Sequence, residues 1–246
     1  DNLFNSAGVA FAEGADARGN EMIEEALDIS RSIGSVLLEG AAFAEISQAL
    51  LETGDAGQAL AVVEDAIAKS DAATGAMSAL LHGTASAIYG LCGMAAPALD
   101  EALISIDLAS PGQLWYFRIS LALAHLESGH LSEAEEALQQ SYFDPQMESK
   151  RDIQYLGMIS ALTDVIRGEL ALAKQDYERV LAYDLEAHQR AADNGMGVLL
   201  PHLLRINAQA LLALGRVEEA GRLLVTARDM AEIQGSKRAL WQILFA

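Results

Sequence analysis

The chain has 246 residues, of which 52% are hydrophobic, 21% are charged and only 6% are aromatic. Alanine and leucine dominate, and both favour helices over strands, so the composition predicts an all-α protein. With 16 basic and 35 acidic residues the net charge is −19, which repels phosphate backbones and anionic lipid headgroups. We therefore expect neither direct nucleic-acid binding nor membrane binding. The chain has no basic-then-apolar start and no long uncharged apolar run, so we expect a cytoplasmic location.

One short pattern recurs along the chain, first seen in Leu50-Leu51-Glu52-Thr53-Gly54-Asp55-Ala56-Gly57-Gln58-Ala59-Leu60. The glycine can close one helix in the left-handed conformation, and Asp55 can cap the N–H groups that open the next. The same spacing predicts further turns at Gly93, Gly129, Gly168 and Gly215. Each turn glycine has an alanine five residues later (Ala59, Ala98, Ala134, Ala173, Ala220) and a small residue seven residues earlier (Ser47, Ser86, Ala122, Ala161, Ala208).

These turns divide the chain into antiparallel helix pairs. We expect one helical repeat domain over 1–246, with repeats at 34–71, 72–109, 111–144, 147–194 and 198–234 and a truncated helix at 236–246. The interval from Gly168 to Gly215 is the longest between turns. Its extra residues predict either two added helical turns around Tyr183 to Asn194 or a short loop at residues 194–197.

The last predicted helix ends on an apolar run, Ala239-Leu240-Trp241-Gln242-Ile243-Leu244-Phe245-Ala246. Because the terminal helix of a repeat array usually turns a polar face to solvent, we expect the chain to be a piece of a longer protein. Mass spectrometry of the native gene product tests this expectation.

A helical hairpin with a turn glycine, a small residue seven before it and an alanine five after it resembles the tetratricopeptide repeat, whose usual length is about 34 residues. The stretch Gly168 to Tyr177 follows the repeat pattern well, although the repeats here are longer than usual. The resemblance implies a right-handed superhelix, an α-solenoid of about five to six antiparallel helix pairs.

The alanine- and leucine-rich stretch from Leu203 to Ala220 is similar to the repeat regions of bacterial signal-transduction ATPases and of LuxR-type or MalT-like regulators. In those families the repeat region is a sensor and interaction arm beside a nucleotide-binding module. This chain has no Gly-x-x-x-x-Gly-Lys-Ser/Thr loop that would cradle phosphates.

In the tetratricopeptide family the first helix of each pair lines a binding groove, at positions thirteen, ten, six and three before the turn glycine. We call these the groove positions. The partner-binding residues that the resemblance implies are Tyr116, Ile119, Leu123, Tyr155, Met158, Leu162, His202, Arg205 and Gln209. Most of them are apolar, which suits an apolar peptide or an amphipathic helix. Plain packing of these side chains against one another is the alternative, and the exposure of Tyr116, Ile119, Tyr155 and Met158 distinguishes the two.

No residue pattern indicates catalysis, a cofactor or a metal. The five histidines include no pair four residues apart, and His125 and His130 are expected to diverge across the Gly129 turn. Cys92 is expected to be buried and inert.

The sequence therefore predicts a non-enzymatic protein-interaction module, within a larger bacterial regulatory protein, that binds a protein or peptide. The alternative is a sensing arm that binds a small-molecule effector near His202, Arg205 and Gln209. Self-association is compatible with either prediction.

Overall fold

The computed structural model describes residues 10, 16–52, 54–69, 75–111, 114–141, 153–182, 188 and 197–246. All regular secondary structure in these ranges is helical, which confirms the predicted all-α class. The chain divides into two compact units, one containing residues 16–51 and 55–147 and the other containing residues 148–246.

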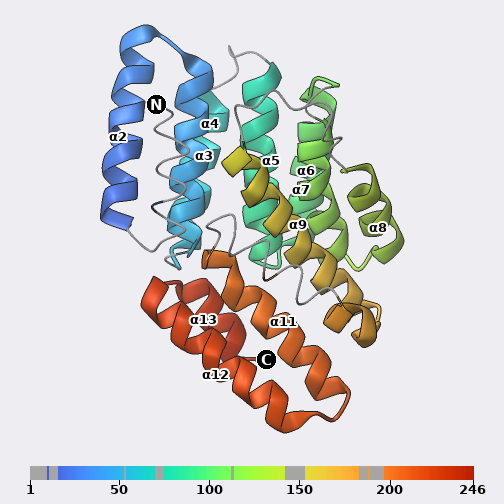
Figure 1. The fold of residues 1–246 in the computed structure, drawn as a ribbon. Coiled ribbons are helices and arrows are strands. Elements are labelled where there is room, and N and C mark those ends of the chain that lie inside the picture. The colour runs from blue at the N-terminus through green and yellow to red at the C-terminus, as the bar shows by residue number, and fades with distance from the viewer. Residues whose placement is uncertain are drawn as a thin grey trace. The chain divides into compact units, whose positions relative to one another are not determined.

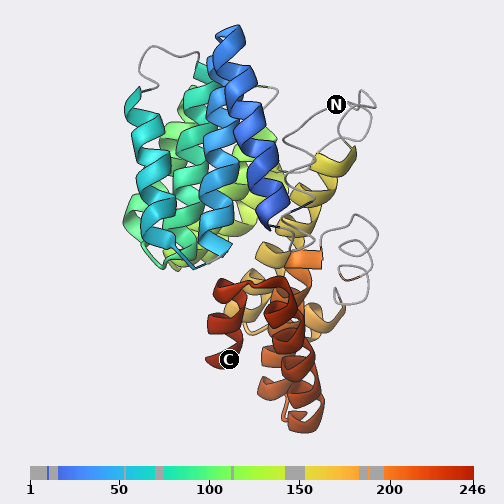
Figure 2. The same cartoon turned by 90° about the vertical axis from the view of Figure 1, so that its left-hand side faces the viewer.

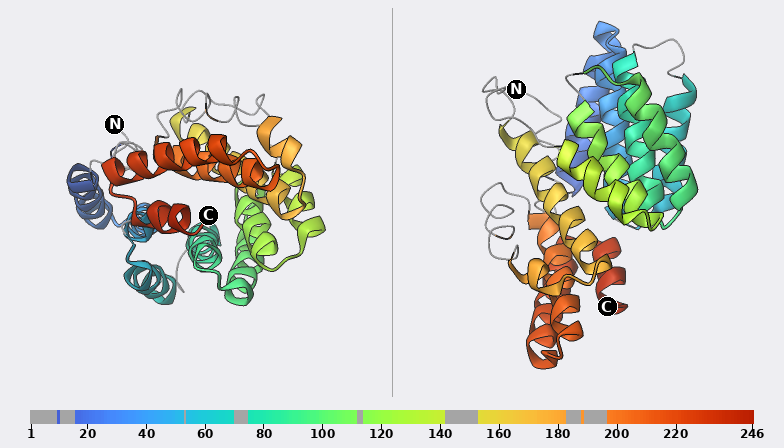
Figure 3. Two further views of the ribbon diagram at one scale, coloured as in Figure 1. Left: turned by 90° about the horizontal axis from the view of Figure 1, so that it is seen from below. Right: turned by 90° about the vertical axis from the view of Figure 1, so that its right-hand side faces the viewer.

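Unit 1 contains seven helices within the described ranges, which lie side by side in Figures 1 and 2 and are seen end-on in the left panel of Figure 3. They are α2 (Asp16–Ile33), α3 (Val36–Glu52), α4 (Ala56–Lys69), α5 (Gly75–Leu91), α6 (Ala95–Leu108), α7 (Leu114–Glu127) and α8 (Leu131–Gln140). Helices α5 and α6 form one pair, and α7 packs on both of them.

Unit 2 begins with the long helix α9 (Ile153–Ala173), and residues 177–182 are again helical. The short 3₁₀ helix η3 (Gly197–Leu199) then leads into α11 (Leu200–Ala213), α12 (Val217–Gln234) and α13 (Lys237–Leu244). Helices α11 and α12 form the best-packed pair of this unit, and α13 lies against both of them (Figure 1). The extension predicted between Tyr183 and Gly197 falls mostly outside the described residues.

Most turns between the described helices share one geometry. Gly93 adopts φ +72°, its N–H bonds to the Gly90 carbonyl at 2.8 Å, and the Met94 N–H bonds to the Tyr89 carbonyl at 2.9 Å. This pair of hydrogen bonds is the Schellman motif, which satisfies carbonyls at the end of a helix. The left-handed conformation also occurs at the predicted turn glycines 54, 129 and 215, and at glycines 34 and 235. The predicted cap is confirmed as well, because the Gln58 N–H bonds to Asp55 Oδ1 at 3.0 Å.

The predicted turn at Gly168 is wrong. Gly168 lies inside α9, which continues to Ala173, and the turn residue is Gln175, whose φ is 59°. The Asp176 N–H bonds to the Ala171 carbonyl at 2.9 Å, and Asp176 Oδ1 accepts from the Arg179 N–H as Asp55 does from Gln58. Gly168 stands seven residues before Gln175 and is therefore the small residue of this pair. The alanine expected five residues after the turn is replaced by the buried Val180.

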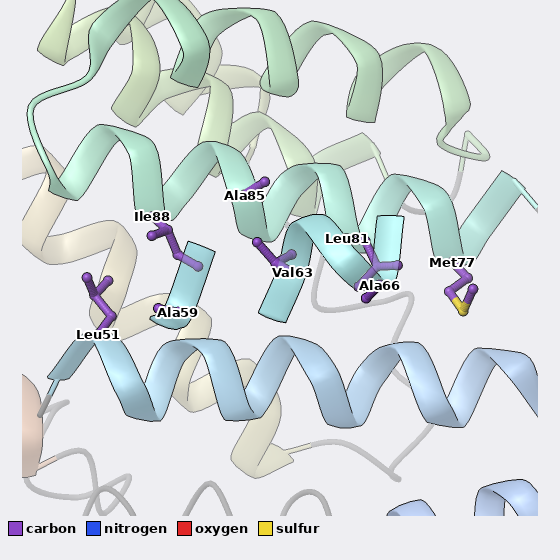
Figure 4. Packing of buried hydrophobic residues seen from close by; sticks show 8 residues of the cluster. All are labelled: Leu51, Ala59, Val63, Ala66, Met77, Leu81, Ala85 and Ile88. Carbon is purple, nitrogen blue, oxygen red and sulfur yellow. The ribbon is translucent and has the colours of Figure 1, made fainter. Parts of the chain in front are cut away.

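One apolar cluster of unit 1 lies where α3, α4 and α5 meet. Figure 4 shows Leu51 of α3, Val63 of α4 and Ile88 of α5 gathered between the three helices. The predicted alanines Ala59, Ala98, Ala134 and Ala220 are fully buried, as are the small residues Ser47, Ser86, Ala122 and Ala208. Ser86 Oγ donates to the Ala98 carbonyl at 2.8 Å, so the small residue of α5 touches the alanine of α6. In this pair the two recurring spacings of the pattern thus bring the two helices together.

Glycines allow the first helices of successive pairs to approach closely. A Cβ on Gly83 of α5 would lie 2.9 Å from the ring of Phe117 on α7, and one on Gly168 of α9 would lie 3.0 Å from Cγ2 of Ile206 on α11. Phe117 and Ile206 are both buried, so each fills the space that the missing side chain leaves. The small residues therefore join pair to pair as well as helix to helix.

Candidate functional site

The predicted groove residues of α7 are largely covered. Tyr116 is partly buried, whereas Ile119 and Leu123 are buried. Leu123 lies so close to Gly90 of α5 that a Cβ there would be 3.3 Å from its Cγ. In this structure Ile119 and Leu123 belong to the interior, and Tyr116 is the predicted α7 residue that reaches solvent.

The α9 part of the prediction is affected by the corrected turn. Tyr155 and Met158 lie in α9, but their side chains are outside the described residues, and Leu162 is partly buried. Counting back from Gln175 instead of Gly168 moves the groove positions of α9 to Leu162, Val165, Glu169 and Leu172. One of these four is an acid, and it is this acid that contacts α11.

The groove residues of α11 form a polar cluster. Arg205 is 6% exposed; its Nη1 donates to Gln209 Oε1 at 2.9 Å and its Nη2 donates to Glu169 Oε1 of α9. Its Nε is buried and has no hydrogen-bond partner among the described residues. A buried donor without a partner costs about 1–3 kcal/mol. The guanidinium therefore links α9 to α11 and retains one unused donor.

His202, one helical turn before Arg205, links α11 to α13. Its Nε2 accepts from Arg238 Nη2 at 3.0 Å, and its Nδ1 lies 3.0 Å from Gln242 Oε1. Because Arg238 can only donate, Nε2 carries the lone pair and Nδ1 carries the proton. The ring is 2% exposed, so the neutral tautomer is held between two side chains of α13.

Helix α13 presents its other side to solvent. Ala239 and Ile243 are buried against α12, together with the partly buried Leu240. By contrast Trp241 is 61% exposed, Leu244 72% and Phe245 76%, and the rings of Trp241 and Phe245 are 5.4 Å apart. We call Trp241, Leu244 and Phe245 the α13 apolar stripe. The sequence predicted this apolar run without assigning it a site. The feature that could have indicated one is that apolar residues occupy two sides of the same helix.

Unit 1 has a polar region of its own, along the sides of α5 that face α4 and α6. His82 Nδ1 lies 2.5 Å from Glu101 Oε2 of α6, and the Tyr89 hydroxyl donates to Glu64 of α4. The hydrogen bond with Glu64, with help from burial and the charge of Glu101, raises the pKa of Tyr89 to about 12. The region consists of paired groups, with each acid held by a donor.

The expectation that His125 and His130 diverge is wrong, because their ring centroids are 5.8 Å apart across the Gly129 turn. Burial, followed by the neighbouring His130, lowers the pKa of His125, and Glu133 opposes this shift. Within the described ranges no group of three or more metal-ligating side chains is assembled. Cys92 is exposed rather than buried.

Among the described residues, no helix is both long and apolar enough to cross a membrane. The family model of the tetratricopeptide repeat matches the chain at residues 115–140 and again at residues 201–226. The first stretch contains most of α7 and all of α8, and the second contains most of α11 and about half of α12, so each match falls on one helix pair. No curated protein and no solved structure matched the chain.

Proposed function

We propose that this chain, a tetratricopeptide-repeat helical domain, is a non-enzymatic module that binds a partner protein through a peptide or helix. Tetratricopeptide repeats generally mediate protein–protein interaction. The observation that supports the proposal is that two separate helix pairs match the repeat, one in each unit. The proposed contact residues that reach solvent are Tyr116, Leu162 and Gln209, each partly buried.

A photo-crosslinking amino acid at Tyr116 tests the proposal. The expected result is a crosslink to a discrete partner protein, identified by mass spectrometry and reproduced with the purified partner. The matched control carries the same amino acid at Thr226, which is exposed on α12 and outside the groove positions. Equal crosslinking at both positions would show that the contact is not specific.

We further propose that the domain belongs to a larger bacterial regulatory protein. The support is the similarity of residues 203–220 to the repeat regions of such regulators. Sequencing the complete gene tests this: an ATPase, cyclase or DNA-binding region in the same polypeptide would agree with the proposal, and its absence would contradict it.

A second candidate function is the sensing of a small polar molecule near His202, Arg205 and Gln209. The buried Nε of Arg205, without a hydrogen-bond partner among the described residues, favours this candidate, since it offers a donor to a ligand oxygen. In a thermal-shift screen a metabolite that binds there raises the melting temperature of the native chain. It should have no such effect on Arg205→Met, which removes the unused donor. Stabilisation by a peptide alone would reject sensing.

A further inference from the structure

The α13 apolar stripe holds the two exposed aromatic side chains among the described residues of unit 2, Trp241 and Phe245. Trp241 and Leu244 are three residues apart on α13 and share one face. Phe245 is the C-cap residue of the helix, and its ring lies against that of Trp241. Lys237, four residues before Trp241, is exposed on the same face. The opposite face, formed by Ala239 and Ile243, is already buried against α12. Helix α13 is therefore fixed on one side and apolar on the other.

The network around His202 fixes this stripe in place. Arg238 and Gln242 both bond to His202, and the Ser236 hydroxyl caps the helix by accepting from the Ala239 N–H at 3.3 Å. Because α13 is held at its N-cap and in both of its turns, the exposed rings are presented by an ordered helix. A preorganised surface loses less entropy when a partner binds.

The charge around the stripe is opposite to that of the chain as a whole. Helix α13, which carries the stripe, contains no acidic residue and has two basic ones, Lys237 and Arg238. The whole chain has 35 acidic and only 16 basic residues. An acidic partner is thus repelled by most of the chain and attracted to Lys237 and Arg238 of α13.

The size of the stripe decides between a second copy and a short segment. An aromatic side chain buries about 150–250 Å² when covered, so the exposed parts of Trp241 and Phe245 amount to on the order of 250 Å². A stable interface between folded proteins needs about 800 Å² from each partner. Two copies would also each carry the charge of −19. The stripe fits one helix, whose apolar side chains pack on the rings.

We propose that the α13 apolar stripe is the docking surface for an amphipathic helix of a partner protein that carries acidic residues beside its apolar face. The apolar face of the partner covers Trp241, Leu244 and Phe245, and its carboxylates face Lys237 and Arg238. This inference rests on the proposed interaction function and names the partner chemistry and the contact face.

The test uses a fluorescently labelled synthetic helix of about 15 residues, a length near the limit of helix stability in water. It has leucines on one face and glutamates on both sides of that face, and its binding is measured by anisotropy. A matched peptide has lysine in place of every glutamate. The native chain is expected to bind the glutamate peptide more tightly, with a difference that shrinks as salt is added.

Three variants locate the contact. Trp241→Ala and Phe245→Ala are each expected to weaken binding by at least about tenfold, as central aromatic contacts do. Ile233→Ala is the control, because Ile233 is an 85% exposed apolar residue of α12 outside the stripe, and its binding is expected to be unchanged. Circular dichroism verifies that each variant is folded. Unchanged binding in Trp241→Ala, or equal binding of the lysine peptide, would overturn the proposal.

Tryptophan fluorescence distinguishes the other occupants. The chain has two tryptophans, so Trp115→Phe leaves Trp241 as the one reporter. A blue shift on adding the glutamate peptide supports docking. A blue shift that grows with protein concentration alone means a second copy, and a shielded Trp241 in the complete gene product means a further helix of the same polypeptide; either rejects the proposal. The Tyr116 crosslink would persist in each case if the interaction function itself is correct.

Discussion

Gly40 of α3 faces Met77 of α5 with no room for a side chain, since a Cβ at residue 40 would overlap both Cγ and Sδ of the methionine. Met77 is 4% exposed and belongs to the core shared by α3, α4 and α5. Cγ is near the start of the side chain, so a change in the rotation of its far end does not relieve the overlap.

We therefore expect Gly40→Ala to lower the free energy of unfolding by about 1–3 kcal/mol, the usual cost of overpacking a core. Urea unfolding followed by circular dichroism measures it. Gly221→Ala is the matched control, because Gly221 lies within α12 and a Cβ there meets nothing within 4 Å. The control should raise stability by about 0.5–1 kcal/mol through helix propensity alone. A neutral Gly40→Ala would mean that α3 and α5 are further apart than described here.

Gln175 is the described non-glycine residue with a positive φ, at 59°, where the equivalent turns use glycine. The left-handed conformation costs an L-residue about 1–2 kcal/mol. Gln175→Gly is therefore expected to raise the free energy of unfolding by about 1 kcal/mol.

Gly215→Ala gives the reverse experiment in the same unit. Its φ is +75° and no atom lies within 4 Å of the added Cβ, so the change introduces backbone strain without a clash. It should lower stability by about 1 kcal/mol. If Gln175→Gly destabilised the chain instead, the turn would not lie at residue 175.

The His125–His130 pair predicts a dependence of stability on pH. The pKa of His125 is lowered in the folded chain, mainly by burial, from an ordinary value near 6.5. The unfolded chain therefore binds more protons below about pH 6.5, so stability is complete above that value and falls as the pH drops through it. Melting temperatures measured from pH 7.5 to pH 5 should decrease.

Two variants test whether His125 causes this dependence of the melting temperature on pH. His125→Gln removes the titrating group and should flatten the part of the curve that it causes. His130→Gln removes the neighbouring positive charge and should move the pKa of His125 upward, because His130 is the second cause of the shift. A pH profile unchanged by both substitutions would show that other groups cause the slope.

The hydrogen bond from Tyr89 to Glu64 should be visible in a spectrophotometric titration. The carboxylate holds the proton on the phenol and raises the pKa of Tyr89 to about 12. Glu64→Gln removes the charge and should return this pKa toward 10. Absorbance near 295 nm, compared between the native chain and the variant, measures the change, and Tyr89→Phe identifies the transition that belongs to Tyr89. A high-pH transition that persists in Tyr89→Phe would assign it to another tyrosine.

The sequence pattern predicted the helix pairs because the turn chemistry is local. A left-handed turn demands a residue such as glycine, and Asp55 caps the following helix through an atom only three residues from its donor. Four of the five predicted turn residues adopt the left-handed conformation for this reason. The fifth prediction, at Gly168, was wrong because this glycine allows a close approach to Ile206 instead of a turn. That contact joins residues 38 positions apart, so no nearby residue pattern indicates it.

The exposure of side chains was harder to predict than the positions of the helices. The positions of Ile119, His202 and Arg205 in the repeat suggested a surface, but each is buried by a neighbouring helix or by polar partners. Arg205 is buried because Glu169 and Gln209 satisfy its guanidinium, and Glu169 was not placed at a groove position until the turn moved to Gln175. The apolar run of α13 was visible in the sequence. Which of its side chains are exposed depends on the side that α12 covers.

The shared turn geometry also has a consequence for how the chain folds. The Schellman turns at Gly93 and Gly215 each join two helices that pack directly on one another, α5 on α6 and α11 on α12. Most native contacts within a pair therefore close short loops, which is the topology of fast-folding helical proteins. In repeat arrays the nucleus can form in any pair and spread to its neighbours. Folding can thus begin in either unit, with no single hairpin that must form first.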